Sequence, residues 1–174
     1  MKIKKNITVK KSTIQGKGVY ANRDYSKGNI VLEIDDSDVV KDHSKLSKKQ
    51  WEFDCDFLAN GKVILMRPPE KFINHSCDPN TYVKTIDQIR KVIARRDIKR
   101  GEEITYDCSI NGDNDGIFVC HCGAHRCRGK YQGSFFKLPW SFQKEYLPYL
   151  EDWFIKEHKI ELDKLFKNEQ KVER

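Results

Sequence analysis

Three cysteines lie close together in this 174-residue chain, in the segment Cys120-His-Cys122-Gly-Ala-His-Arg-Cys127. Cysteines in C-x-C spacing rarely bridge to each other, because a disulfide requires particular Cα separations and torsion angles. Such a cluster more often binds zinc, which accepts thiolates and takes four ligands in a tetrahedron. The cluster supplies three of them. The candidates for the fourth ligand are Cys77, Cys108, His121 and His125. Three buried free thiols are the alternative interpretation.

Two glycines, an asparagine and a histidine form a second group of residues that could contact a ligand. Gly16 and Gly18 have no side chain to keep such a ligand away from the backbone, and glycine adopts turn conformations freely. A buried Asn74 amide would offer two donor hydrogens and an acceptor. Each feature also has a structural interpretation, a hairpin turn for the glycines and a core histidine for His75. The residues alone leave ligand binding open.

Charge alternates along the chain. Lysines and arginines number 33 against 26 acidic residues, which gives a net charge of +7, and 38% of the residues are hydrophobic. Residues 1–11 and 84–100 are basic, whereas acidic residues gather at 33–38, 52–56 and 107–115. Nucleic-acid-binding surfaces usually concentrate basic and aromatic residues on one face, so this alternation does not favour them. The acidic patches would suit a lysine- or arginine-rich peptide.

The length fits one ordinary domain, with room for a small appendage. The longest aliphatic run, residues 63–66, is far shorter than the roughly 20 residues that cross a bilayer. The first residues do not lead into an apolar signal segment. We therefore expect a soluble, intracellular protein with no membrane partner. The sequence does not distinguish nucleus from cytoplasm and says nothing of the oligomeric state.

The elements that must position these residues are predicted to be mainly short strands. Alternating apolar residues and β-branched side chains favour strands at 7–9, 19–21, 30–34, 62–66, 81–86, 89–94 and 103–106. Residues 37–51 are polar and lysine-rich, which predicts a short helix or a surface insertion, and 107–116 is loop-like in composition. From Pro139 onward the pattern is helical, with Pro139 in a first turn and Pro148 as a break.

Four motifs follow one another along the chain. They are Gly16-Lys17-Gly18-Val-Tyr-Ala21, Phe72-Ile-Asn74-His75-Ser-Cys77-Asp-Pro-Asn80, Gly101-Glu-Glu-Ile-Thr-Tyr106-Asp107, and the cysteine cluster running into Arg128-Gly129. Together, and in this order, they resemble the SET-domain protein-lysine methyltransferases. The cysteine cluster resembles the zinc-binding post-SET segment of that family. The resemblance covers roughly residues 8–130.

The resemblance implies a mainly β, β-clip-like SET fold of small curved sheets with a knot-like C-terminal segment, followed here by a helical tail. It also implies S-adenosylmethionine as methyl donor and the side-chain amine of a protein lysine as acceptor. The cofactor-binding residues that it implies are Gly16, Lys17, Gly18, Phe72, Asn74 and His75. The zinc ligands that it implies are Cys77, Cys120, Cys122 and Cys127, with Cys108 as a rival to Cys77.

The chain is accordingly predicted to have three parts. These are a SET domain at 8–117 with an insert at about 36–62, a post-SET zinc-binding segment at 118–133 and a helical C-terminal extension at 134–174. The expected partner is a lysine in a protein or peptide, in a basic segment such as a histone tail or another DNA-associated protein.

Two residues depart from the family's pattern. Cys108 replaces the tyrosine that ends the third motif, and Ile34 replaces a tyrosine near the end of the first strand block. The resemblance places Tyr106 and Cys108 in the catalytic site. Methyl transfer is an in-line displacement that depends on alignment, so the shorter and weaker donor Cys108 predicts a loss of rate. Two further hypotheses remain, a cofactor-binding but catalytically weak protein-binding module and a zinc-dependent nucleic-acid-binding protein.

Overall fold

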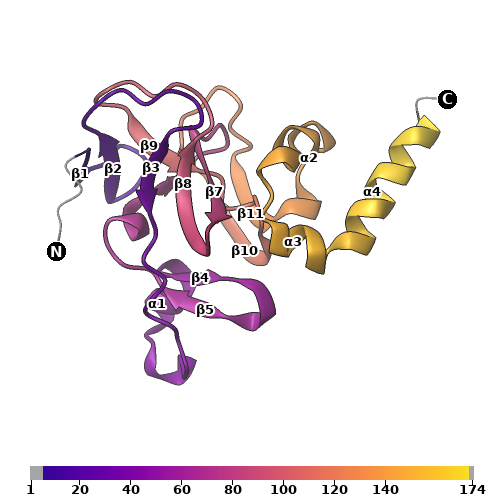
Figure 1. Cartoon of the computed structure of the whole chain (residues 1–174), viewed down its shortest axis with the longest axis horizontal. Coiled ribbons are helices and arrows are strands. Elements are labelled where there is room, and N and C mark those ends of the chain that lie inside the picture. The colour runs from indigo at the N-terminus through magenta and orange to yellow at the C-terminus, as the bar shows by residue number, and fades with distance from the viewer. Residues whose placement is uncertain (1–5, 173–174) are drawn as a thin grey trace.

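The structure is a computed structural model that describes residues 6–172, apart from the side chains of residues 114, 115, 166 and 168–172. Small β-sheets dominate the part up to residue 134, and short helices follow (Figure 1). The predicted extension at 134–174 ends outside the described residues. The predicted fold class, mainly β with a helical C-terminal tail, is confirmed.

The first sheet joins segments that are far apart in the sequence. Its strands are β1 (Ile7–Lys11), β2 (Lys17–Ala21), β9 (Glu103–Tyr106) and β6 (Asn74–His75), in the order β1-β2-β9-β6. The turn between β1 and β2 contains Gly16 at φ +51°, a conformation that side chains disfavour. The parallel pairing of β6 with β9 sets His75 opposite Tyr106. Two motif segments therefore lie side by side.

A second sheet completes the main core. Its strands are β3 (Ile30–Glu33), β8 (Ile89–Ala94) and β7 (Thr81–Ile86), antiparallel and in the order β3-β8-β7. Buried apolar side chains from both sheets form one cluster that includes Val19, Leu32, Val92 and Ile104. Burying each such side chain contributes about 1.5–3 kcal/mol, so this core holds β9 firmly in place.

The segment predicted as an insert forms a small unit of its own, which projects from the sheets in Figure 1. Its elements are 3-10 turns at His43–Lys45 and Ala59–Gly61, α1 (Lys48–Phe53), β4 (Cys55–Phe57) and β5 (Val63–Leu65). Reciprocal hydrogen bonds between Ser47 and Gln50 cap the start of α1. Arg90 of β8 fastens the unit to the second sheet, because its guanidinium donates to Asp36 and to Asp56.

A third hairpin carries the cysteine cluster between its strands. β10 (Asp113–Val119) pairs antiparallel with β11 (Lys130–Ser134). The predicted loop at 107–116 is therefore wrong from Asp113 onward. Its polar composition is typical of loops, but the pairing with β11 satisfies the backbone and makes it a strand. The short strands β4 and β6 were also not predicted, because each is defined by a partner strand elsewhere in the chain.

The helical extension has a second core of its own. Its elements are 3-10 turns at Phe135–Lys137 and Leu147–Tyr149 and the helices α2 (Trp140–Tyr146), α3 (Asp152–Glu157) and α4 (Lys159–Val172). A further 3-10 turn, Glu70–Phe72, lies outside the extension, just before β6. Pro139 immediately precedes α2, and Pro148 lies in the turn that separates α2 from α3. Buried Phe135, Tyr146, Phe154 and Leu162 pack together in this core. None of the described helices is both long enough and apolar enough to span a bilayer.

Candidate functional site

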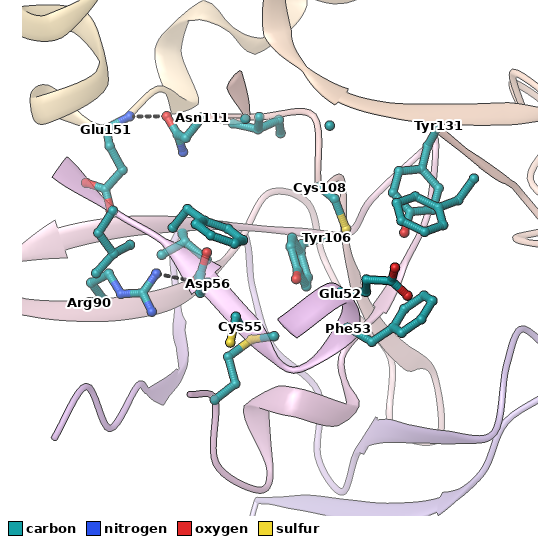
Figure 2. A pocket seen from close by; sticks show the side chains of 18 of the residues that line it. Glu52, Phe53, Cys55, Asp56, Arg90, Tyr106, Cys108, Asn111, Tyr131 and Glu151 are labelled. Atoms are coloured by element: carbon teal, nitrogen blue, oxygen red, sulfur yellow. Dashed lines mark hydrogen bonds and ion pairs between the residues drawn. The ribbon is translucent and has the colours of Figure 1, made fainter. Parts of the chain in front are cut away.

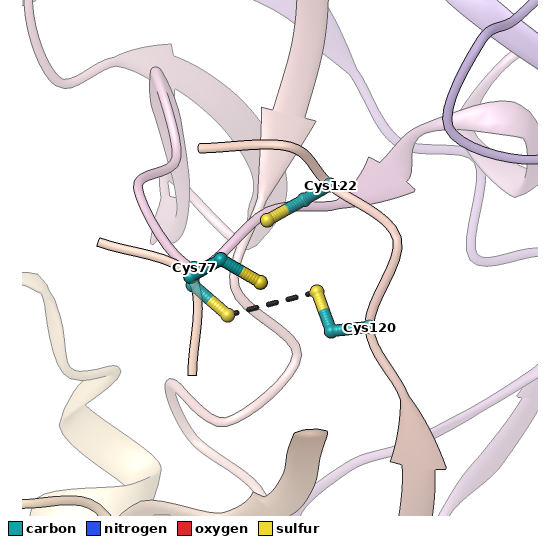
Figure 3. A group of neighbouring side chains, drawn as sticks. Cys77, Cys120 and Cys122 are labelled. Carbon is teal, nitrogen blue, oxygen red and sulfur yellow. Dashed lines mark hydrogen bonds between the residues drawn. The ribbon is translucent and has the colours of Figure 1, made fainter. Parts of the chain in front are cut away.

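The four cysteines Cys77, Cys120, Cys122 and Cys127 converge in space. All their sulfur atoms lie within 4.8 Å of one another, and the Sγ atoms of Cys77 and Cys120 are 3.7 Å apart (Figure 3). A tetrahedral zinc ion with Zn–S bonds of about 2.3 Å places its sulfurs about 3.8 Å apart. The turn after β6 delivers Cys77, and the β10–β11 hairpin delivers the other three. The donor set and its spacing therefore fit a structural zinc ion.

The rival ligands lie outside this group of sulfurs. Neither Cys108 nor the histidines His121 and His125 belong to it. Burial raises the pKa of the Cys77 thiol to about 11, against the weaker opposing effects of its hydrogen bond from Arg128 and of the Arg128 charge. A bound cation favours the thiolate strongly, so the cluster has the geometry and the chemistry of a site that would exchange thiol protons for metal.

The cysteine cluster is tied to the end of β9 by a buried ion pair. Arg128 donates to both carboxylate oxygens of Asp107, at 2.7 and 3.0 Å, and its backbone N–H points at Cys77 Sγ at 3.4 Å. Tyr146 of α2 donates to Asp107 Oδ2 or to the carbonyl oxygen of Cys77, both at 3.2 Å. The extension therefore contacts the same residues that hold the cluster.

His75 links the cluster to Cys108. Its Nδ1 accepts the backbone N–H of Cys108 at 3.2 Å, and its Nε2 lies 3.5 Å from Cys77 Sγ. Burial lowers the pKa of His75 to about 4, although the nearby Asp107 carboxylate acts in the opposite direction. A neutral ring that accepts at Nδ1 carries its hydrogen at Nε2 and donates it toward the sulfur. The ring also stacks on Tyr131, with centroids 4.1 Å apart.

Asn74 and Glu103 anchor the glycine turn. The Asn74 amide donates to the carbonyl oxygens of Gln15 and Lys17, at 3.2 and 3.0 Å, and to Glu103 Oε1 at 2.7 Å. The Glu103 carboxylate also accepts from Ser12 and Tyr20. A Cβ on Gly18 would collide with this carboxylate. The missing side chain of Gly18 therefore makes room for the Glu103 carboxylate in this structure.

A cavity of about 350 Å³ opens between the glycine turn and β6. Five of the six predicted cofactor-binding residues line it, namely Gly16, Lys17, Phe72, Asn74 and His75. Gly18, the sixth, is not among its lining residues. Cavities of about 300–1,000 Å³ commonly hold small ligands and cofactors. We call this the donor cavity, because the family resemblance assigns most of these residues to the methyl donor.

A second cavity, of about 440 Å³, lies between the insert, the second sheet and the extension (Figure 2). Figure 2 shows Tyr106 near its centre with Cys108 beside it, Glu151 and Arg90 to one side and Tyr131 to the other. We call this the acceptor cavity, because it contains Tyr106, which the family resemblance places in the catalytic site where the methyl group is accepted. The residues that line both cavities are Phe53, Met66, Tyr106, Cys108 and Tyr131.

Tyr106 and Cys108 stand where the two cavities meet. The pKa of Tyr106 is raised well above its usual value, first by the neighbouring Cys108 and then by burial. The phenol therefore stays protonated and can donate or accept a hydrogen bond within the cavity. Ile34, the other departure from the family pattern, packs against the main core and lines neither cavity.

Sequence reasoning missed several residues of the site. Tyr131 lines both cavities and stacks on His75 and on Phe118, but in the sequence it is an isolated tyrosine four positions after Cys127. Glu103 lines neither cavity but accepts from Asn74, and its place in the Gly101-Glu-Glu motif was a usable signal. The aromatic residues of the insert carried no such signal, because their place at the acceptor cavity depends on how the insert folds back.

Comparison with known proteins identifies the family of this chain. The SET domain profile matches residues 16–109. Over 138 residues, the chain is 36% identical to human Histone-lysine N-methyltransferase 2D, covering 72% of this chain and 2% of that protein. It is 30% identical over 141 residues to Drosophila melanogaster Histone-lysine N-methyltransferase trr, covering 71% of this chain and 6% of that protein. The chain thus spans only a small fraction of the length of these relatives.

Among solved structures, the chain is similar to a Plasmodium falciparum protein provisionally named a histone methyltransferase. The TM-score is 0.49 and the sequence identity 22%, with 59% of this chain and 92% of the other covered.

Proposed function

This chain belongs to the SET-domain family, and on that premise we propose that it transfers a methyl group from S-adenosylmethionine to the side-chain amine of a protein lysine. The relatives named as histone-lysine N-methyltransferases support this reaction class. Their names also support a histone tail, or another basic segment of a DNA-associated protein, as the acceptor. Such an acceptor would place the reaction inside the cell.

The observation that carries the proposal is the junction of the two cavities. Methyl transfer requires the nucleophile to approach the methyl carbon in line, on the side opposite the sulfur whose bond to that carbon breaks. Here the donor cavity and the acceptor cavity share Tyr106, Cys108 and Tyr131 as lining residues. Two ligands that occupy these cavities would meet at that point.

The residues of the donor cavity suit a nucleotide-like cofactor. Gly16 is in the left-handed region, and a Cβ built there would meet no atom within 4 Å, so the turn leaves space at the cavity. Lys17 Nζ lies 5.3 Å from the ring centroid of Phe72, within the range of a cation–π contact, and both residues line the cavity. S-adenosylmethionine bound there would supply an electrophilic methyl group on a positively charged sulfur.

The acceptor cavity suits a neutral amine. A free lysine has a pKa of about 10.4 and is protonated at neutral pH, and a partly desolvated channel lowers that pKa. Tyr106 would accept a hydrogen bond from the amine and orient its lone pair. Cys108 would lie next to it as a weaker hydrogen-bonding partner. Phe53 and Tyr131 would exclude water at the junction.

Zinc, in this proposal, is structural and is held by Cys77, Cys120, Cys122 and Cys127. The ion would crosslink the turn after β6 to the β10–β11 hairpin. Because His75 contacts both Cys77 and Cys108, the crosslink would stiffen the junction of the cavities.

The test is transfer of a labelled methyl group to a panel of lysine peptides that includes histone tails. Methylated lysine identified by mass spectrometry is the expected result. A protein that binds S-adenosylmethionine but methylates no peptide or protein in the panel would instead support the second candidate, a catalytically weak binding module. The presence of Cys108 where the family has tyrosine is the observation that favours this second candidate.

A further inference from the structure

The helical extension forms part of the wall of the acceptor cavity. Trp153 and Glu151 line the cavity, although both lie outside residues 16–109 that match the SET domain. Neither residue lines the donor cavity. The extension therefore reaches the site from a part of the chain that the family profile does not cover.

Three contacts hold the extension in this position. The Glu151 carboxylate accepts from the backbone N–H and the hydroxyl of Thr85, at 2.9 and 3.0 Å, and Glu151 itself is 3% exposed. The Glu151 N–H donates to Asn111 Oδ1 at 2.6 Å. On the other side, Glu157 of α3 accepts the backbone N–H of Asn60 in the insert at 3.0 Å. Glu151 and Glu157, which flank Trp153 in the sequence, thus attach this part of the extension to the second sheet and to the insert.

Four apolar residues close to these contacts in the sequence line the acceptor cavity but not the donor cavity. Val83 lies two residues before Thr85 on the same face of β7, Ile110 precedes Asn111, and Leu58 lies two residues before Asn60. We define the outer subsite by its residues Leu58, Val83, Ile110 and Trp153, all of which line the acceptor cavity. The Trp153 ring makes an edge-to-face contact with the buried Phe154 ring, with centroids 5.7 Å apart.

The outer subsite is continuous with the place where the target lysine would react. Both belong to one cavity of about 440 Å³, and the lysine itself would use the part at Tyr106 and Cys108. A cavity of this size holds a drug-sized molecule, which is more than one lysine side chain. The lining also includes the charged side chains of Glu52, Asp56 and Arg90, but the four residues of the outer subsite are apolar. These four would be stabilised by contact with another apolar group of the same acceptor.

We propose, building on the function proposed above, that the outer subsite binds an apolar side chain of the acceptor protein next to the target lysine, and that Trp153 determines this specificity. Glu151 is a positioning residue, because it acts through the contacts that hold Trp153 in place. The extension is then a part of the acceptor site that selects among lysines by their neighbours.

The experiment measures binding, so that it does not depend on catalysis. The full chain, with S-adenosylhomocysteine present, is applied to an array of lysine-centred peptides in which each flanking position is varied. We expect the unaltered protein to prefer an apolar residue at one flanking position. Trp153→Ala should weaken binding of the preferred peptides about tenfold and flatten the preference, because truncating this half-buried aromatic side chain removes most of its contact with the peptide. Trp153→Phe should retain part of the preference.

Ile155→Ala is the matched control. Ile155 lies on the same helix, is apolar and 42% exposed, and does not line the acceptor cavity, so this variant should keep both affinity and preference. Leu58→Ser alters the subsite from the insert side and should reproduce the effect of Trp153→Ala without touching the second core. Affinity for S-adenosylhomocysteine should be unchanged in all variants, which separates a local effect from misfolding.

The outcomes of the two proposals are distinguishable. No apolar preference in the unaltered protein, or the same preference in Trp153→Ala and Leu58→Ser, would overturn the outer subsite. A clear preference that both variants lose, in a protein that transfers no methyl group, would support the subsite and refute the proposed catalytic function.

Discussion

Asn74 offers the sharpest test of how the donor cavity is built. Its amide donates to the carbonyl oxygens of Gln15 and Lys17 and to the Glu103 carboxylate, so it ties the Gly16 turn to β6. Asn74→Ala removes these hydrogen bonds and leaves three acceptors to find other partners. We therefore expect the turn to open and the cavity to lose its shape.

The size of the effect follows from the contacts. Two amide hydrogens serve three acceptors. A hydrogen bond to a neutral group contributes about 0.5–1.5 kcal/mol and one to a charged group about 1.5–3 kcal/mol. Because Asn74 is only half-buried, water replaces part of this, and we expect a loss of about 2 kcal/mol. If that energy is what holds the turn in its binding conformation, affinity for S-adenosylmethionine falls tenfold to a hundredfold, at about 1.4 kcal/mol per factor of ten.

Calorimetric titration with S-adenosylmethionine measures this loss directly. Asn74→Asp has the same shape but lacks the donor hydrogens and adds a negative charge beside Glu103, so it should bind more weakly still. Asn29→Ala is the control, since Asn29 is an exposed turn residue outside both cavities. Wild-type affinity in Asn74→Ala would refute the reasoning.

Three further predictions concern the metal, the reaction and the pH dependence of stability. The purified protein should contain about one zinc per chain by elemental analysis, with Cys122→Ser losing the metal and Cys55→Ser keeping it; a metal-free but equally stable protein would contradict this. The Tyr106 hydroxyl would crowd a methylated amine, so the product should be monomethyl-lysine, and Tyr106→Phe should shift it to higher methylation. Cys108→Tyr should raise turnover without changing cofactor affinity, and mass spectrometry of the methylated peptide tests both expectations. Burial raises the pKa of Glu151, partly offset by the hydrogen bonds from Thr85, so the stability that this group contributes is full below the usual carboxyl pKa and is lost as the pH rises. Glu151→Gln should therefore show a smaller loss of unfolding free energy than the unaltered protein between pH 4.5 and 7 in urea titrations, and an unchanged pH dependence would contradict this.

The local chemistry of the site was readable from the chain because its motifs are contiguous. The Gly16 turn, the Asn74-His75 pair and the cysteine cluster each span a few residues, so residue type and spacing carried the information. The zinc ligand set shows where this stops. Spacing left Cys77, Cys108 and two histidines open as the fourth ligand, and the choice of Cys77 rested on resemblance. The position of its sulfur beside the cluster depends on the pairing of β6 with β9, which joins segments about thirty residues apart.

The sequence by itself determined the class of the fold, most of its longer strands and the stretches that contribute to the donor cavity, because hydrophobic alternation and turn residues act over short distances. Tertiary structure alone decided what surrounds the acceptor cavity. Trp153, Phe53 and Val83 come from the extension, the insert and the second sheet, and nothing in their local sequence distinguishes them from ordinary core residues. They meet because long-range contacts, such as Glu151 with Thr85 and Glu157 with Asn60, close the chain around that space.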